Sequence, residues 1–393
     1  MDFDDTPEEA SYRAKVRAWL DDHAGPFVAT HVDQRSHADY VAWCRSWQRA
    51  LFDGGWAGIT WPSEYGGQGG TPMQKAIFDE EVARYGLSVG AFTLALGTCG
   101  PAIIAGGTPE QQQRHLPAIL RGEHIWCQLF SEPGAGSDLA SLSTRARRDG
   151  DEWIVDGQKV WTSGAHHADY GLLFARTNPD VPKHRGLTLF IVDMTSPGIE
   201  IRPLRQMTGD AHFNEVFLTD VRLPGDANVG PVDEGWRVAL TALASERTAL
   251  GTGILRTYTT EQLATVARTA GLAEDPLTRQ RLAAHHIRAE ILRLLAYRVQ
   301  TALSRGEPLG PESSVSKLAF GRHVEAATTL MVDLLGPAGV LADDPATEFC
   351  AQWGPRLGGG TEQIQRNVLA ERVLGLPREP VVDRDVPWSE LHR

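Results

Sequence analysis

A short apolar segment that runs straight into a glycine-rich turn is the feature that most constrains this chain. Residues 126–138 read WCQLFSEPGAGSD, so the first five residues predict a strand and the remainder predicts a tight turn. Gly134 and Gly136 lack a Cβ, which allows backbone N–H groups of the turn to converge on an anion. Ser131 and Ser137 place hydroxyl groups beside that position. A glycine-rich turn alone is also typical of an ordinary surface loop, so a second feature has to support a binding site.

The second feature is residues 157–164, which read GQKVWTSG. Trp161 is a large, flat indole, and the hydroxyl side chains of Thr162 and Ser163 follow it directly. A dinucleotide with a planar ring system needs a turn that accepts phosphate and an aromatic plate flanked by hydroxyl groups. The two stretches together therefore indicate a site for such a cofactor.

Helical patterns occupy the region before these stretches. Thr6-Pro7-Glu8-Glu9 is typical of a helix start, because it combines a hydroxyl cap, a proline in the first turn and an acid three residues after the cap. Further helices are expected at residues 37–53, 72–85, 88–106 and 109–120. Residues 61–70 (WPSEYGGQGG) predict a loop, which is either a rigid connector between helices or part of a ligand site.

The sequence pattern changes twice more along the chain. Short β-forming segments, separated by turns such as Asp156-Gly157, lie at residues 126–130, 152–155, 159–162, 170–175, 187–192, 200–203 and 215–218. Long helices are expected at residues 236–269, 276–305 and 313–335, before a proline-rich tail from residue 377 that reads as an extended arm. The predicted fold class is α+β, mostly α. It comprises an N-terminal helical domain (1–121), a small middle β-domain (122–226) and a C-terminal four-helix bundle (227–393).

Charge and composition exclude several classes of protein. The formal net charge of −12 argues against nucleic acid or an anionic membrane as the main partner. No apolar run approaches the ~20 residues that cross a bilayer, and the acidic N-terminus is unlike a targeting leader. The four cysteines are far apart and read as free thiols, so a cytoplasmic location is expected. The histidines, including the adjacent His166 and His167, lack metal-ligand spacing and read as surface or packing residues, so no metal is predicted.

Four stretches, which together span nearly the whole chain, resemble the signature motifs of the acyl-CoA dehydrogenase family. They are residues 61–67 (WPSEYGG), 126–138, 157–164 and 358–366 (GGGTEQIQR), and they follow the family's order. The resemblance implies FAD as the cofactor and an acyl-CoA thioester as the substrate, whose Cα–Cβ bond is oxidised. A carboxylate would remove the α-proton while the β-hydrogen leaves as a hydride to flavin N5.

The resemblance also implies roles for individual residues. Flavin contacts are implied for eight of them: Gln128, Phe130, Ser131, Ser137, Trp161, Ser163, Thr361 and Gln363. Trp161 would lie against the isoalloxazine, and Ser163 would hydrogen-bond to N5. Ser137 would lie near the flavin phosphates or the CoA arm, so it is also a candidate substrate contact. The backbone N–H near Gly359 would be one donor to the thioester carbonyl, and the ribityl hydroxyl of FAD would be the other.

The catalytic base departs from the common family pattern. Most members carry a glutamate immediately before the Gly-Thr of the last motif, and this position is Gly359 here. A smaller branch, which includes the isovaleryl-CoA enzyme, carries the base in a Glu-Arg pair on a helix of the last domain. Glu246 and Arg247 match that pair. A glutamate on a long helix is otherwise typical of a solvated surface. Because Gly359 leaves the role open and apolar residues flank the pair, Glu246 is the predicted base, with Arg247 holding substrate or local structure.

Other departures concern the assembly. An Arg and a Phe-Gly pair, through which a neighbouring family subunit holds the FAD pyrophosphate and adenine, are missing from residues 269–281, and Asp333 replaces a family glutamine. Residues 202–224 and 370–380 look most like an actinobacterial subgroup that degrades steroid side chains and other bulky acyl-CoAs. Some of its members are hetero-oligomers. We therefore expect a catalytic subunit of a homo-oligomer, such as a tetramer, or of a hetero-oligomer with a related subunit, with an electron-transferring flavoprotein as electron acceptor.

Two other functions are compatible with the same sequence. An acyl-CoA oxidase or a flavin monooxygenase would pass its electrons to dioxygen, and Gly359 is compatible with either. A degenerate subunit that only supports a catalytic partner is the other alternative, although the intact Trp161 and Ser163 argue against it. The sequence does not define the acyl group, nor whether CoA or a carrier protein bears the thioester.

Overall fold

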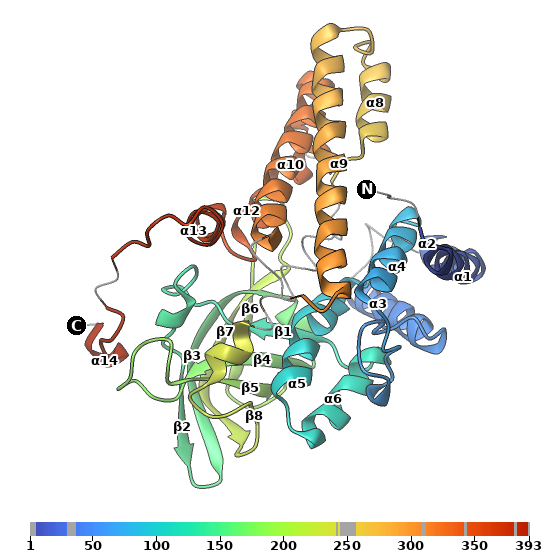
Figure 1. Cartoon of the computed structure of the whole chain (residues 1–393). Coiled ribbons are helices and arrows are strands. Elements are labelled where there is room, and N and C mark those ends of the chain that lie inside the picture. The colour runs from blue at the N-terminus through green and yellow to red at the C-terminus, as the bar shows by residue number, and fades with distance from the viewer. Residues whose placement is uncertain are drawn as a thin grey trace. The chain divides into compact units, whose positions relative to one another are not determined.

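The computed structural model describes residues 5–29, 37–240, 243, 257–307, 312–341, 344–380 and 383–391. The chain divides into two compact units, each described by itself (Figure 1). The first lies within residues 1–204, 211–246 and 380–393, and the second within residues 205–210 and 247–379. The first unit therefore contains both stretches that indicate a cofactor site, whereas the second contains the C-terminal motif at residues 358–366.

The N-terminal helices begin where the sequence places hydroxyl caps. They are α1 (Pro7–His23), α2 (Gly25–Ala29), α3 (His37–Asp53), α4 (Pro72–Arg84), α5 (Gly100–Gly106) and α6 (Pro109–Leu120). Thr6, Thr71 and Thr108 each form a complete capping box with the glutamate or glutamine three residues later. A proline after each of these caps favours the first helical turn. The predicted helix start at Thr6 is confirmed.

The helix predicted over residues 88–106 extends from residue 90 to 106 but is not α-helical throughout. This part of the chain forms a 3-10 turn (η2, Gly90–Phe92), a π-helical turn (η3, Ala95–Cys99) and then α5. Pro101 has no N–H and cannot join the usual hydrogen-bond ladder, and the N–H of Gly100 donates to the carbonyl of Ala95, five residues back. The chain is therefore helical over nearly the predicted range, and the hydrogen-bond ladder changes its spacing beside the proline.

The loop at residues 61–70 is tied to itself and to the core. It contains a 3-10 turn (η1, Ser63–Tyr65), and the N–H of Gly69 donates to the Trp61 carbonyl at 2.8 Å. The Trp61 indole is buried. At Gly67 an added Cβ would lie 2.3 Å from the Trp61 carbonyl oxygen, so the backbone passes too closely for any other residue. These contacts support the interpretation of the loop as a rigid connector.

One eight-stranded sheet forms the β-region of the first unit. Its strands are β1 (Trp126–Leu129), β2 (Arg145–Asp149), β3 (Glu152–Ser163), β4 (Tyr170–Arg176), β5 (Leu187–Asp193), β6 (Ile199–Leu204), β7 (Phe213–Pro224) and β8 (Asn228–Val229). Their order is β6-β7-β3-β2-β4-β5-β8, and β1 pairs with β4 in parallel. Strand β3 continues through Asp156-Gly157, because register shifts against β7 absorb the irregular residues. The prediction of a turn between two separate strands at this position is wrong.

Strands β4 and β5 are covered on both faces. Leu172 and Phe174 of β4 share a core with residues of the N-terminal helices such as Trp47. The intervening Leu173 and Ala175 point the other way and share a second core with the outer strands. Alternate residues of a strand face opposite sides of the sheet, so burial on both faces explains why the sequences of these two strands are almost entirely apolar.

The end of the chain returns to the first unit. Residues 375–380 contain neither helix nor strand, and α14 (Trp388–Leu391) follows. The N–H of Trp388 donates to the Val181 carbonyl at 2.9 Å, and the Arg176 guanidinium lies 4.5 Å from the centre of the Trp388 ring. The predicted extended arm therefore describes only the first part of the tail, because the last part packs against the β-region.

The second unit is helical. It contains α8 (Thr260–Thr269), α9 (Pro276–Ser304), α10 (Glu312–Leu335), α11 (Asp344–Ala351), α12 (Trp353–Leu357) and α13 (Glu362–Arg372). Helices α8, α9 and α10 lie side by side (Figure 1). Their small core joins Leu263 and Ala267 of α8 to Leu330, Met331 and Leu334 of α10. The predicted helices at residues 276–305 and 313–335 are confirmed.

The helix predicted over residues 236–269 is wrong as a single element. Residues 235–240 and 243 are helical, but residues 257–259 are not. Thr259 caps α8 by accepting a hydrogen bond from the N–H of Gln262 at 3.1 Å, so a new helix begins there.

The architecture is α+β and mostly α, with helical, β and helical regions in that order along the chain, and the predicted fold class is confirmed. No helix in the described part of the chain combines the length and hydropathy of a membrane span.

Replacing Gly67 by alanine should destabilise the loop at residues 61–70. The new methyl group would press against the Trp61 carbonyl oxygen, so we expect the free energy of unfolding to fall by ~1–3 kcal/mol. Chemical unfolding followed by circular dichroism measures the change. Gly25→Ala is the matched control, because a Cβ added there meets no atom within 4 Å. Equal stability of the two variants would contradict the rigid-connector interpretation.

Candidate active site

A buried ion pair holds the start of the glycine-rich turn. The ammonium of Lys159 on β3 lies 2.8 Å from a carboxylate oxygen of Glu132, and both side chains are buried. The same ammonium donates to the carbonyls of Phe130 at 3.0 Å and Phe174 at 2.7 Å. Three oxygen acceptors satisfy the charge of Lys159, so this buried cation is fully paired.

The Glu132 carboxylate has a complete set of partners of its own. Its oxygens accept hydrogen bonds from the N–H and the hydroxyl of Ser143, at 2.7 and 2.9 Å, and from the N–H of Thr144 at 2.8 Å. Burial alone would raise the pKa of Glu132, but the Lys159 ammonium and these hydrogen bonds lower it to about 2. Burial lowers the pKa of Lys159 to about 8. Both groups are therefore charged at neutral pH.

The far end of the turn is held by a second ion pair. Asp138 accepts a hydrogen bond from the Ser141 hydroxyl at 2.6 Å and pairs with Lys183 at 3.0 Å. Lys183 also pairs with Asp383, in the C-terminal segment, at 2.9 Å. The last residues of the chain are thus linked through one lysine to the glycine-rich turn.

Between these two anchors the turn presents open backbone. Gly134 and Gly136 are exposed, and a Cβ added at either position would meet no atom within 4 Å. Ser137 is exposed beside them, whereas Ser131 is half-buried. The carbonyl of Ser131 accepts a hydrogen bond from the N–H of Val160 at 2.9 Å. The fold therefore joins the two stretches that the sequence singled out, and leaves the tip of the turn free to receive a ligand.

Trp161 combines exposure with backbone strain. Its φ of 59° lies in the left-handed region, where bulky residues are rarely found. The side chain is 61% exposed although β3 is otherwise largely buried, and the ring of Phe213 meets it edge-on at 5.9 Å. Strain of this kind persists only where the surrounding structure enforces it, and it is common at ligand sites.

The other predicted flavin contacts of the first unit lie on β1, directly after it and at the end of β3. Phe130 is buried against Phe174, with 5.4 Å between ring centres, and Gln128 is half-buried. Ser163 is half-buried at the end of β3, where it pairs in register with Phe213. The roles assigned to these side chains remain predictions.

The C-terminal motif in the second unit forms a glycine turn followed by a capped helix. Gly359 and Gly360 have φ values of 63° and 92°, and Gln365 donates to both of their carbonyls, at 3.3 and 3.4 Å. Thr361 caps α13 by accepting a hydrogen bond from the N–H of Ile364 at 3.2 Å. Gln363 is exposed. The left-handed turn accounts for the glycines at positions 359 and 360 of this motif.

Glu362, in the same motif, is unsuited to remove a proton. Its carboxylate pairs with Arg356 at 2.8 Å and Arg366 at 3.0 Å. Burial favours a raised pKa, but the two guanidinium groups outweigh it and lower the pKa of Glu362. A strongly paired carboxylate is a weak base. The predicted base Glu246 and its neighbour Arg247 lie outside the described residues.

Asp333, which replaces a family glutamine, has a partner within the second unit. Its carboxylate pairs with Arg281 of α9 at 2.5 Å. The arginine is part of residues 269–281, where the family's Arg and Phe-Gly pair is missing. Both departures from the family pattern therefore meet in one contact.

Sequence reasoning missed the charged residues that support the site. Glu132 lies in the turn itself, and Lys159 and Lys183 hold the turn from two other segments. Arg176 donates to the Leu142 carbonyl at 3.1 Å, a few residues beyond the turn. A signal was present, because a lysine within an otherwise apolar strand is seldom buried without a partner. The identity of that partner, 27 residues away in sequence, became visible only with the fold.

Replacing Lys159 by methionine should destabilise the first unit strongly. The substitution would leave the Glu132 carboxylate buried without its cation, and we expect a loss of ~3–5 kcal/mol in the free energy of unfolding. The double variant Lys159→Met/Glu132→Gln removes both charges and should recover part of that loss. Chemical unfolding of the unmodified protein, the two single variants Lys159→Met and Glu132→Gln, and the double variant measures the coupling. If the two changes were simply additive, the ion pair would not hold the turn.

Comparison with known proteins covers almost the whole chain. The family models for the N-terminal, middle and C-terminal domains of acyl-CoA dehydrogenases match residues 6–123, 127–221 and 233–374. The acyl-CoA dehydrogenase IpdE1 of Mycobacterium tuberculosis is 38% identical over 379 residues, which cover 94% of this chain and 98% of IpdE1. FadE34 of the same organism is 45% identical over 332 residues, which cover 84% of this chain and 46% of FadE34. This chain therefore spans about half the length of FadE34.

Solved structures agree with these relatives. The structure described as Tcur3481-Tcur3483 steroid ACAD has a TM-score of 0.83 at 32% identity. The match covers 96% of this chain and 100% of that chain. The ChsE4-ChsE5 complex from Mycobacterium tuberculosis has a TM-score of 0.80 at 31% identity, with coverage of 96% of this chain and 100% of that chain. With three matching domain models and relatives of full length, the chain belongs to the acyl-CoA dehydrogenase family of oxidoreductases.

Proposed function

We propose that this chain is an FAD-dependent acyl-CoA dehydrogenase that forms a double bond between Cα and Cβ of an acyl thioester. The observation that carries the proposal is Trp161, an exposed indole in a strained backbone conformation. It lies on the strand that is fastened to the glycine-rich turn through Lys159. Membership of the family supports this function over the alternatives that use the same fold.

The residues of the first unit suit an FAD molecule. The open backbone at Gly134 and Gly136, with the exposed hydroxyl of Ser137, would receive the diphosphate. The indole of Trp161 would pack against the flavin ring, and Ser163 would hydrogen-bond to its N5 edge. Gln128, Phe130 and Ser131 would line the ring or the ribityl chain. When bound, FAD supplies the acceptor for the β-hydrogen of the substrate, which leaves as a hydride.

Two residues of the C-terminal motif, Thr361 and Gln363, would complete the flavin contacts. Thr361 has its hydroxyl engaged in the cap of α13, which fixes the start of the helix, and Gln363 is exposed two residues later. The left-handed turn at Gly359 orients backbone N–H groups, and the N–H there would donate to the thioester carbonyl. Such a donor stabilises the enolate that develops when the α-proton is removed.

Glu246 is the proposed general base. The α-proton of a thioester is a very weak acid, so its base needs a dry pocket that raises the carboxyl pKa toward neutrality. Gly359 has no side chain, and Glu362 is held by two guanidinium groups, so the C-terminal motif does not supply the base. Arg247 would hold the substrate or the local structure beside Glu246, and Ser137 would contact the CoA arm.

The proposed substrate is a bulky acyl-CoA, such as one with a steroid side chain. One solved relative is described as a steroid ACAD, and this supports a similar substrate class for the present chain.

The ChsE4-ChsE5 structure is a complex of two proteins, which supports an oligomer, either of identical chains or with a related subunit. Within each chain we place domains at residues 1–121, 122–226 and 227–393. An electron-transferring flavoprotein would accept the electrons.

The variant Glu246→Gln tests the proposed base. We expect the rate of flavin reduction by an acyl-CoA to fall by ~10²-fold or more, because a positioned general base is lost. Anaerobic stopped-flow absorbance measures this rate, and the flavin content should stay at the level of the unmodified protein. Glu261→Gln is the matched control, since Glu261 is an exposed acid in the first turn of α8. Reduction of the Glu246→Gln protein at a near-normal rate would remove this residue from the role.

A further inference from the structure

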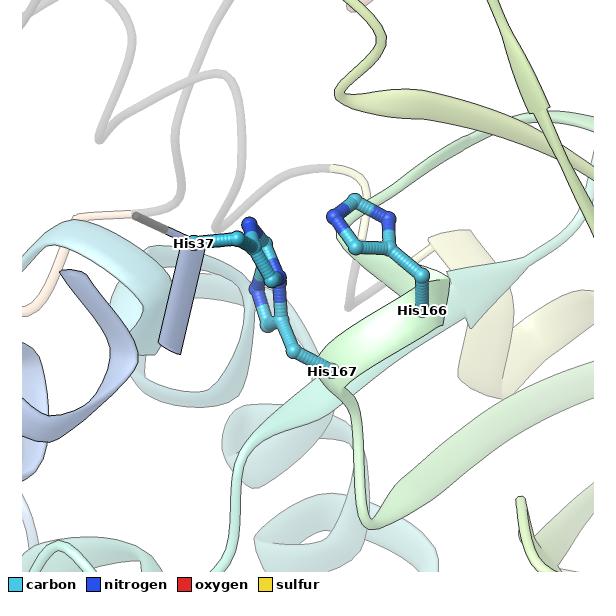
Figure 2. A group of neighbouring side chains, drawn as sticks. All are labelled: His37, His166 and His167. Atoms are coloured by element: carbon cyan, nitrogen blue, oxygen red, sulfur yellow. The ribbon is translucent and has the colours of Figure 1, made fainter. Parts of the chain in front are cut away.

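Three histidines that are distant in sequence meet in the first unit. His37 begins α3, whereas His166 and His167 lie in a 3-10 turn (η5, Ala165–His167) directly after β3. Figure 2 shows His37 and His167 together, with the ring of His166 opposite them. Nδ1 of His167 lies 2.9 Å from Nε2 of His37, and one nitrogen from each of the three rings falls within 4.8 Å of the others.

A buried asparagine sets the orientation of His166. The side-chain N–H₂ of Asn214 donates to the carbonyls of Thr162 at 2.9 Å and His212 at 3.2 Å. The Asn214 oxygen therefore faces the imidazole, and it lies 3.1 Å from Nδ1 of His166. This oxygen can only accept, so Nδ1 of His166 carries the proton and its Nε2 keeps a free lone pair. Histidines that bind metals are typically held in this way by a second hydrogen bond.

A glycine sets the orientation of His167. Gly164 has a φ of +66°, and a Cβ added there would lie 2.7 Å from Nε2 of His167. The Nε2 edge of the ring thus packs against the glycine, while Nδ1 points to His37. Both special properties of glycine are used at this position, the left-handed backbone and the missing side chain.

The three rings are packed closely enough to share one ion. The centre of the His37 ring lies 4.2 Å from that of His166 and 4.8 Å from that of His167. The charged groups Arg45 and Asp169 near His167 are paired with each other at 2.8 Å. After small rotations of the imidazoles, each of the three nitrogens could lie at the Zn–N bond length of ~2.0–2.1 Å from one shared ion.

We propose that His37, His166 and His167 form a binding site for a divalent transition-metal ion, with Zn²⁺ the best match. Imidazole nitrogens favour this class of ion over Mg²⁺ or Ca²⁺, which prefer oxygen ligands. Three histidines leave the fourth tetrahedral position to water. The sequence predicted no metal because the adjacent pair lacks ligand spacing, and the third ligand lies 130 residues from His167.

The ion would link two parts of the first unit. His37 is the first residue of α3, and His166 lies three residues after Ser163. Binding would therefore tie the start of that helix to the turn that follows Trp161 and Ser163. The inference does not depend on the proposed dehydrogenase activity, because it rests only on the three imidazoles and the groups that orient them.

Metal binding to the full chain, prepared without a histidine tag and treated with a chelator, tests the proposal. Titration with Zn²⁺ against a chromogenic chelator should show one tight site per chain. His37→Ala should weaken that site at least ~10-fold, and His167→Ala should do the same. His37 is exposed, so its loss should leave the fold intact, which circular dichroism verifies. His286→Ala, which changes another exposed histidine on α9, should bind Zn²⁺ as the unmodified chain does.

A second readout reports the ligands themselves. Co²⁺ bound to three imidazoles gives visible d–d bands, which His37→Ala should abolish and His286→Ala should preserve. Zn²⁺ should also raise the melting temperature of the unmodified protein but not that of His37→Ala, because a ligand that binds the native state stabilises it. Equal Zn²⁺ affinity in the unmodified protein, His37→Ala and His167→Ala would overturn the proposal, as would the absence of any site above the background of the other histidines.

Discussion

The buried ion pair of Glu132 and Lys159 fixes the start of the glycine-rich turn to strand β3. Lys159 belongs to β3, Glu132 to the turn after β1, and the ammonium also binds the carbonyls of Phe130 and Phe174. Separating these segments would leave a buried charge without its partner, which is strongly destabilising, so the ion pair holds them together. The glycine-rich turn can therefore present exposed backbone and still keep one shape, which is what a preorganised phosphate site requires.

The strained backbone at Trp161 is balanced by the pairing of β3 with β7 on both sides of it. Gln158 pairs with Phe217 before the bulge, and Thr162 pairs with Asn214 after it. A left-handed conformation at a bulky residue costs about 1–3 kcal/mol, and it persists only when its neighbours enforce it. The side-chain oxygen of the same Asn214 lies against Nδ1 of His166 in the histidine cluster. One irregular end of β3 therefore joins the exposed indole to the three imidazoles.

Local signals in the sequence predicted much of the fold but not its long-range contacts. The cap at Thr6, the strand at residues 126–130 and the long helix at 276–305 follow from patterns that operate within a few residues. The dipeptide Asp156-Gly157 has the composition of a turn, yet it lies in a continuous strand because β7 pairs with it. The change from α-helical to π-helical hydrogen bonding before Pro101 cannot be predicted from a simple periodicity.

The candidate site likewise has parts that local sequence signals predict and parts that depend on long-range contacts. The glycine-rich turn, Trp161 and the C-terminal glycines each indicate a site through the composition of a few adjacent residues. Lys159 and Glu132 are 27 residues apart, and His37 and His167 are 130 apart. Pairs at such separations leave no periodic trace in a single sequence, so the contacts that support the turn and that gather the histidines emerge only from the folded chain.

The central claim is that the turn at residues 131–138 and the end of β3 form a flavin site. The visible absorption spectrum of the purified full chain, recorded after incubation with excess FAD and gel filtration, tests it most directly. We predict the two bands of bound flavin co-eluting with the protein, at about one flavin per chain. A protein that elutes without flavin under these conditions, both alone and together with a related partner subunit, would contradict the claim.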